Sequence, residues 1–272
     1  ELASESLGYN LQNISFYNSH NELNNTKYTQ PAIFVHSVII DKLLKDKGII
    51  PKAVAGHSLG EFSALVSCSC INFKDAIKIV KIRSTEMANN ENISPGAMAA
   101  IFGANKEQIQ IICNQKNIVV PANYNSIDQT VISGEIEGID KAIKTAKKLG
   151  IKRAIKLNVS GAFHSPLMSP ARIPLLNIAN SIKFNNTKIP IYQNNTAKPE
   201  TSGSIIKKNI IDQLENPVLW IETIQNMKKD GFNSFFETGP GKILTGLNRR
   251  IYPDSETIHF NKIEDLVNYE PV

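Results

Sequence analysis

Ser58 stands between two glycines in Gly56-His57-Ser58-Leu59-Gly60, a pattern suited to nucleophilic catalysis. The apolar run Ala53-Val54-Ala55 precedes it, and a helical pattern begins at Glu61. A serine at a strand-to-helix turn is the sequence form of a nucleophile elbow. We expect the two glycines to let the strand and helix backbones pass closely. We also expect free N–H groups at the start of the helix to stabilise an oxyanion beside the serine.

A serine nucleophile needs a base, and His164 is the best candidate. It lies in residues 159–166, which read as a strand end followed by a loop, where functional residues collect. An ordinary loop histidine is the alternative. His57 is next to Ser58, and we expect its side chain to point elsewhere. No Asp or Glu between Ser58 and His164 stands out as the acid of a hydrolase triad, which argues against a simple esterase.

Arg83 is the third residue of interest. It shares one face of a predicted helix over residues 73–89 with Ala76, Ile79 and Met87. An arginine on an apolar face must be paired, reach solvent or hold an anion. A guanidinium is the natural bidentate partner of a carboxylate, so this position could bind an acidic ligand. An arginine that extends to solvent at the helix rim is the alternative.

The composition is typical of a soluble globular protein with one large domain, or with one domain that carries a smaller insert. Of 272 residues, 42% are hydrophobic and 20% are charged, and no apolar run is long enough to span a membrane. The three cysteines indicate a reducing compartment rather than a disulfide framework. The histidines lack metal-ligand spacing, and the scattered lysines behind the net charge of +5 do not form a nucleic-acid-binding stripe.

Strands alternate with helices, which favours an α/β fold with a hydrolase-like, mainly parallel sheet. From about residue 94 to 160 the order becomes β-α-β-β-α-β, the signature of a ferredoxin-like unit. We therefore expect a large catalytic domain (residues 1–93 and 161–272) and a small inserted subdomain (residues 94–160). The expected helices are 30–47, 61–70, 73–89, 106–115, 139–149, 166–181, 204–214, 220–229 and one from 242. The expected strands are 53–55, 97–102, 118–123, 130–133, 153–157, 189–193 and 234–237.

Several motifs occur together in one order. With them the chain resembles, nearly end to end, the malonyl-CoA:acyl carrier protein transacylases and the related acyltransferase domains of polyketide synthases. The motifs are Thr29-Gln30-Pro31-Ala32, Gly56-His57-Ser58-Leu59-Gly60-Glu61, Lys81-Ile82-Arg83, Asn123-Tyr124-Asn125-Ser126, Val131-Ile132-Ser133-Gly134, Gly161-Ala162-Phe163-His164-Ser165-Pro166-Leu167-Met168, Gln213-Leu214-Glu215-Asn216-Pro217-Val218-Leu219-Trp220 and Glu237-Thr238-Gly239-Pro240-Gly241-Lys242.

The resemblance implies a role for each matching residue. Ser58 would be the nucleophile and His164 the base, oriented by the main-chain carbonyl of Gln213 instead of an acid. Arg83 would bind the free carboxylate of a malonyl group. The other implied roles are His57 near that carboxylate, Asn123 and Asn125 supporting the pocket, and the N–H of Leu59 as one oxyanion donor.

The implied activity is a ping-pong transfer of malonyl from malonyl-CoA to the phosphopantetheine thiol of acyl carrier protein, for fatty-acid synthesis. We expect a cytoplasmic monomer, or a plastid or mitochondrial one, that needs no metal or other cofactor and binds neither nucleic acid nor membrane. The alternatives are an acyltransferase of a polyketide pathway and a serine thioesterase or esterase.

One departure from the family pattern concerns the oxyanion hole. Family members open with a strand and a Gly-Gln-Gly loop. The glutamine N–H of that loop forms the other half of the oxyanion hole. This sequence begins at Glu1 without that loop. Loss of one oxyanion donor costs on the order of 100- to 1,000-fold in rate. We therefore expect the full protein to carry the segment. A gene without it would favour a non-catalytic module that binds the carrier protein.

Overall fold

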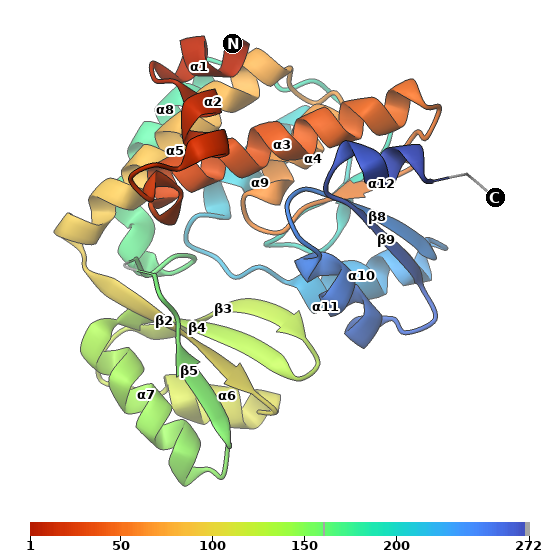
Figure 1. Cartoon of the computed structure of the whole chain (residues 1–272). Coiled ribbons are helices and arrows are strands. Elements are labelled where there is room, and N and C mark those ends of the chain that lie inside the picture. Colours follow the sequence, from red (N-terminus) through yellow and green to blue (C-terminus); the bar gives the residue numbers. More distant parts are fainter. Residues whose placement is uncertain (160, 270–272) are drawn as a thin grey trace.

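Two lobes make up the molecule (Figure 1). The structure is a computed structural model, and it describes residues 1–159 and 161–269. The small lobe runs from β2 (Gly96–Phe102) to β5 (Arg153–Lys156), and the chain before and after it forms the large lobe. No helix in these described ranges is long and apolar enough to cross a lipid bilayer.

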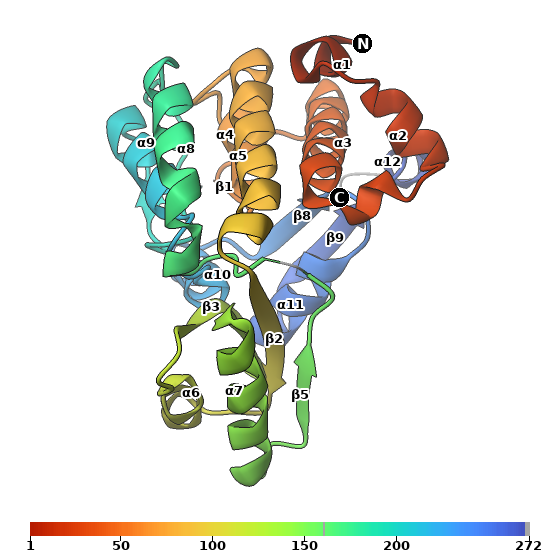
Figure 2. The same cartoon turned by 90° about the vertical axis from the view of Figure 1, so that its left-hand side faces the viewer.

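Helices dominate the large lobe, where α3, α5 and α8 lie side by side (Figure 2). Helix α4 (Gly60–Ser67) packs against α3 and α5 and buries Phe62 and Leu65 completely. The three aligned helices are α3 (Thr26–Asp46), α5 (Phe73–Ile93) and α8 (Arg172–Asn180). The others are α1 (Leu2–Leu7), α2 (Leu11–Tyr17), α9 (Gly203–Asp212), α10 (Trp220–Lys229), α11 (Ile243–Ile251) and α12 (Ile263–Val267).

The strands of the large lobe form two small sheets. In one, β1 (Val54–Ala55) pairs in parallel with β6 (Ile191–Tyr192), and β6 pairs antiparallel with β7 (Pro199–Glu200). In the other, β8 (Ser234–Thr238) pairs in parallel with β9 (Glu256–Phe260). The α/β class is confirmed. The expectation of one mainly parallel sheet is not, because the sheets are mixed and separate.

A cavity of about 470 Å³ is lined by residues of both sheets, from β1 and β8, and by residues of helices α4 and α10. In the described part of the chain, β1 pairs only with β6 and β8 only with β9.

The small lobe is a four-stranded antiparallel sheet with the order β3-β4-β2-β5. Strand β3 spans Val119–Ser126 and β4 spans Gln129–Glu135. Helices α6 (Lys106–Cys113) and α7 (Ile136–Lys148) pack on it around Ile101, Ile132 and Ile139, which are fully buried. Because strand side chains alternate between faces, this core uses every second residue of the sheet.

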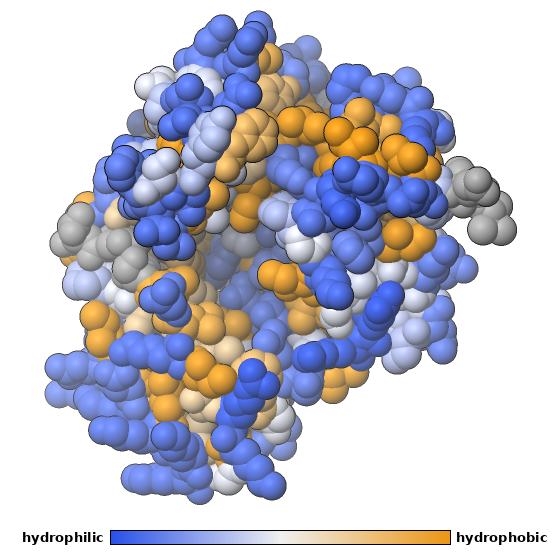
Figure 3. Space-filling model, in the orientation of Figure 1, coloured by the Kyte–Doolittle hydropathy of each residue, from blue (hydrophilic) through white to orange (hydrophobic). Residues whose placement is uncertain are grey.

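Backbone hydrogen bonds join the two lobes. The N–H of Tyr124 donates to the carbonyl of Val218, and the N–H of Val218 donates to the carbonyl of Ala122, each at 2.9 Å. Strand β3 also packs against α10 and α11 of the large lobe. Figure 3 shows the surface hollowed between the lobes on the face presented.

Several elements differ from the expected ones. Helix α3 begins earlier, at Thr26, where Asn25 caps it. The helix expected over residues 166–181 is divided into a 3₁₀ turn, Pro166–Ala171, and α8, because Pro170 has no N–H to donate. Strand β9, which contains His259, is not among the expected strands.

Candidate active site

The turn between β1 and α4 has the geometry of a nucleophile elbow. Ser58 adopts a φ of 52°, a left-handed conformation that costs energy in a non-glycine residue. A Cβ added to Gly56 would lie 2.0 Å from the carbonyl carbon of Gly60, so only glycine fits there. Gly60 has open space at its own Cβ position. The expectation that both glycines are needed for close approach is therefore wrong for Gly60.

Two amide side chains fix the backbone of Ser58. Its N–H donates to Oδ1 of Asn194 at 2.6 Å, and its carbonyl accepts from Nε2 of Gln213 at 3.0 Å. Nδ2 of Asn194 also donates to the carbonyl of Gly56 at 2.6 Å. Because the polar groups on both sides of Ser58 are bound, the strained turn is held in one conformation.

His164 faces Ser58. Its Nε2 lies 2.8 Å from the Oγ of Ser58, and its Nδ1 lies 3.0 Å from the carbonyl oxygen of Gln213 and 3.2 Å from that of Asn216. Carbonyls only accept, so Nδ1 carries the proton and Nε2 is free to accept from the serine hydroxyl. His164 also has a positive φ, of 57°.

Burial keeps His164 neutral. It lowers the pKa of the imidazole to about 3, and the nearby charge of Arg83 acts in the same direction. A neutral imidazole with a free Nε2 is the form that can remove a proton from Ser58. The pair Ser58–His164 therefore has the protonation state of a nucleophile and its base.

Arg83 is buried, with 2% of its surface exposed, so the alternative of an arginine reaching solvent at the helix rim is wrong. Its Nη2 donates to Oγ of Ser58 at 3.0 Å and to Oε1 of Gln213 at 3.1 Å, and its Nη1 donates to Oε1 of Gln30. The ring of Phe62 lies 5.3 Å from the guanidinium. Burial lowers the pKa of Arg83 to about 10, which leaves it charged at neutral pH. A buried cation beside the nucleophile can bind an anionic group of an acyl donor.

His57 belongs to a neighbouring cluster. Its Nε2 lies 2.8 Å from Oδ1 of Asn125, and its ring centroid lies 5.7 Å from that of Trp220. Burial lowers the pKa of His57. Within the described chain, no hydrogen bond joins His57 to Ser58, His164 or Arg83. The backbone of Asn123 pairs with that of Val218 in a parallel β-bridge.

The N–H of Leu59 is available to an oxyanion. In the residues that the structure describes, it has no hydrogen-bond acceptor, whereas the N–H of Ser58 is taken by Asn194. Leu59 immediately precedes α4, so its N–H belongs to the positive end of that helix.

The prediction did not include the carbonyl of Asn216, nor the side chains of Gln30, Glu61 and Asn194. Gln30 and Glu61 lie inside motifs that carried the resemblance, but their residue types gave no separate reason to select them. Asn194 follows β6, and polar residues at the end of a parallel strand were an available signal. As for metals, the described residues bring no three His, Cys, Asp or Glu side chains together.

Comparison with known proteins shows the family to which the chain belongs. Residues 2–258 match the family model described as acyl transferase domain, so the chain belongs to the acyl transferase family. The malonyl CoA-acyl carrier protein transacylase of Haemophilus influenzae is 39% identical over 96% of this chain and 85% of that protein. The protein of that name in Escherichia coli is 39% identical over 92% and 82%.

Solved structures agree as well. The acyl carrier protein S-malonyltransferase of Vibrio cholerae superposes with a TM-score of 0.93 at 39% identity, over 98% of this chain and 88% of that one. A malonyl-transacylase solved in complex with its type II polyketide synthase acyl-carrier protein has a TM-score of 0.93 at 38% identity, over 98% and 87%. The expected family and the expected acyltransferase class are thus confirmed.

Proposed function

We propose that this protein transfers a malonyl group from malonyl-CoA to the phosphopantetheine thiol of acyl carrier protein, through an ester on Ser58, and supplies fatty-acid synthesis. The names of its relatives support the donor and the acceptor. A polyketide pathway is the second candidate, because one similar structure pairs with a polyketide synthase carrier protein.

The observation that carries the proposal is the contact between Arg83 and Ser58. Nη2 of Arg83 lies 3.0 Å from the nucleophilic oxygen. An acyl group bound to both must therefore carry its carboxylate close to its thioester carbonyl. Malonyl satisfies this requirement with a single methylene between the two groups. An acyl group without a carboxylate would leave a buried cation unpaired, which is unfavourable.

In the first half-reaction, Oγ of Ser58 attacks the thioester carbonyl while its proton passes to Nε2 of His164. The N–H of Leu59 donates to the oxyanion of the tetrahedral intermediate. The intermediate collapses, the carbon–sulfur bond breaks, and the CoA sulfur takes the proton from His164. The carbonyls of Gln213 and Asn216 hold the imidazole and stabilise its protonated form through Nδ1.

In the second half-reaction, the thiol of phosphopantetheine gives its proton to His164 and attacks the malonyl ester. The carbon–oxygen bond to Ser58 breaks, and Oγ recovers the proton from Nε2. No metal or redox cofactor takes part in this scheme. A thioesterase would instead deliver water to the ester, so the two reactions differ in their second acceptor.

The experiment is incubation of the protein with malonyl-CoA, followed by peptide mass mapping. A malonyl ester on the peptide that contains Ser58, discharged by holo acyl carrier protein, is the expected result. Ser58→Ala must remove the adduct. Absence of the adduct from the wild-type protein would refute the proposal, and discharge by water alone would identify a thioesterase.

We infer a cytoplasmic location and a monomer as parts of the same proposal. The three cysteines are free, as in a reducing compartment. Sedimentation would check the monomeric state.

We further infer that the small lobe is a ferredoxin-like subdomain over residues 94–160, inserted into a hydrolase-like domain of residues 1–93 and 161–272. Its strand order and two helices support this.

A further inference from the structure

Glu61 is a fully buried carboxylate directly beneath the nucleophile. Oε2 accepts from Nε2 of Gln213 at 2.8 Å and from the N–H of Asn194 at 3.1 Å. Oε1 accepts from Nε2 of Gln193 at 2.9 Å. Three donors therefore converge on one carboxylate on the first turn of α4.

Two of these donors belong to the residues that fix Ser58. Gln213 binds the carbonyl of Ser58 with its side chain and Nδ1 of His164 with its main chain. Asn194 binds the N–H of Ser58. Glu61 touches neither the nucleophile's Oγ nor the base, yet it is common to the groups that orient both.

Glu61 is also linked to the carboxylate-binding position. Oε1 of Gln213 accepts from Arg83, while Nε2 of the same amide donates to Glu61. The amide thus lies between a buried cation and a buried anion. Turning it over would place its N–H groups against the guanidinium and its oxygen against the carboxylate, so the two charges fix its orientation.

We propose that the Glu61 carboxylate is a positioning residue that must be ionised for Ser58 to be reactive. Its ionised form accepts all three hydrogen bonds. A protonated carboxyl would carry a hydroxyl that faces N–H donors, and at least one of the three bonds would be lost. The amides of Gln213 or Asn194 would then release the strained backbone of Ser58.

The surroundings of Glu61 define the pH range over which the reactivity of Ser58 changes. Burial raises the pKa of Glu61 to about 7, opposed by the hydrogen bonds from Gln213, Gln193 and Asn194 and by the charge of Arg83. The histidines on the nearby turn and loop, His57 and His164, both have lowered pKa values and stay neutral there. The reactivity of Ser58 should therefore increase through about pH 7 because Glu61 ionises, not because His164 does.

The test measures the rate at which a fluorophosphonate labels Ser58 between pH 5.5 and 8.5. This probe needs no malonyl donor, so it is independent of the proposed acyl-transfer function on which the interpretation rests. The variants are Glu61→Gln, which keeps the shape and removes the charge, and Glu61→Asp, which keeps the charge.

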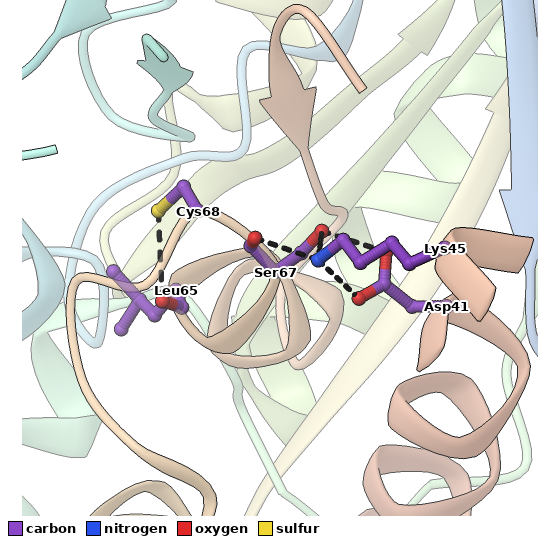
Figure 4. A network of polar contacts seen from close by, with 5 residues as sticks. All are labelled: Asp41, Lys45, Leu65, Ser67 and Cys68. Atoms are coloured by element: carbon purple, nitrogen blue, oxygen red, sulfur yellow. Dashed lines mark hydrogen bonds and ion pairs between the residues drawn. The ribbon is translucent and has the colours of Figure 1, made fainter. Parts of the chain in front are cut away.

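Asp41→Asn is the matched control. Asp41 accepts from Oγ of Ser67 and from Nζ of Lys45, each at 2.7 Å, and so ties α3 to the opposite end of α4 (Figure 4). This substitution removes a partly buried carboxylate bound to the same helix, away from Ser58. Thermal unfolding of every variant reports the folded fraction.

We expect Glu61→Gln to be labelled about 100-fold more slowly than the wild-type protein at pH 8, the cost of a nucleophile misplaced by about 1 Å. Its labelling rate should also lack the step, that is, the increase near pH 7 expected of the wild-type protein. Glu61→Asp should keep a step but at a shifted pH and with slower labelling, because its shorter carboxylate cannot keep all three hydrogen bonds, and Asp41→Asn should behave as the wild-type protein. A step that persists in Glu61→Gln overturns the proposal, as does labelling at the wild-type rate. If Glu61→Gln does not fold, wild-type labelling by Glu61→Asp at pH 8 with an unshifted step overturns it. Wild-type protein that reacts with the fluorophosphonate but not with malonyl-CoA refutes only the acyl-transfer function.

Discussion

Asn194 holds Ser58 from behind: its Oδ1 accepts the N–H of Ser58 at 2.6 Å, while its Nδ2 donates to the carbonyl of Gly56, also at 2.6 Å. One side chain therefore satisfies two backbone groups of the elbow. Because the N–H of Ser58 is occupied, the next N–H, of Leu59, is the one left for an oxyanion. These two hydrogen bonds, called the Asn194 clamp below, stabilise the strained turn. They also leave the N–H of Leu59 as the oxyanion donor.

Asn194→Leu should remove this clamp while preserving volume. Two buried backbone groups would lose their partner at about 1–3 kcal/mol each, so we expect the free energy of unfolding to fall by about 2–6 kcal/mol. Acylation of Ser58 should slow by about 100-fold as the turn relaxes. Urea unfolding and the rate of malonyl adduct formation measure the two effects.

Asn195→Leu is the control for this substitution. The Oδ1 of Asn195 is buried without a hydrogen-bond partner in the described structure. The same chemical change one residue later should therefore leave both quantities near the wild-type values. Equal effects at the two positions would contradict the clamp.

Arg83→Ala should abolish the preference for malonyl over acetyl donors. Charged hydrogen bonds contribute about 1.5–3 kcal/mol, so we expect the ratio of kcat/KM for malonyl-CoA and acetyl-CoA to fall by roughly 100-fold. Acetyl transfer should persist or improve, since an unpaired cation is removed. Arg153→Ala, which removes a guanidinium stacked on Phe102 in the small lobe, is the control. Malonyl selectivity that survives in Arg83→Ala would exclude the carboxylate-binding role.

Gly56→Ala and Gly60→Ala should have opposite effects. At Gly56 the new methyl would overlap the backbone of Gly60 at 2.0 Å, and overpacking of this kind costs about 3 kcal/mol. At Gly60 the methyl meets open space on the first turn of α4, so alanine should stabilise by up to about 1 kcal/mol. Thermal unfolding distinguishes them, and similar melting temperatures would contradict the close approach.

His164 should make the fold sensitive to acid. Because the pKa of His164 falls from 6.5 to about 3 on burial, the native state binds fewer protons than the unfolded chain between these values. Its contribution to stability is present above pH 6.5 and is lost as the pH falls toward 3. His164→Asn, which tolerates the positive φ, should lose less stability between pH 7 and pH 4. Parallel stability curves for the two proteins would refute this assignment.

The sequence was most informative where chemistry and local structure coincide. The glycine, strand and helix around Ser58 indicate a nucleophile. The position of Arg83 on an apolar helical face indicates a binding site for an acidic ligand. The approach of the Gln213 carbonyl to His164 could be expected only from the resemblance. No periodicity marks a main-chain oxygen, and 49 residues separate the two.

The rest depends on contacts that a local pattern does not contain. Asn194 reaches Ser58 over a separation of 136 residues, and Gln30 reaches Arg83 over 53. Gln30 was marked only by its place in a family motif, and Asn194 only by its place after a parallel strand.

The backbone hydrogen bonds among Ala122, Tyr124 and Val218 couple the positions of the two lobes. On one side of these bonds, β3 carries Asn123 and Asn125 of the proposed acyl pocket. On the other, the segment ending at Val218 supplies both acceptors of His164. A displacement of the small lobe that admits a bulkier acyl group would also shift the atoms that tune the base. A substitution at this junction is therefore expected to change acyl-group selectivity and proton transfer together.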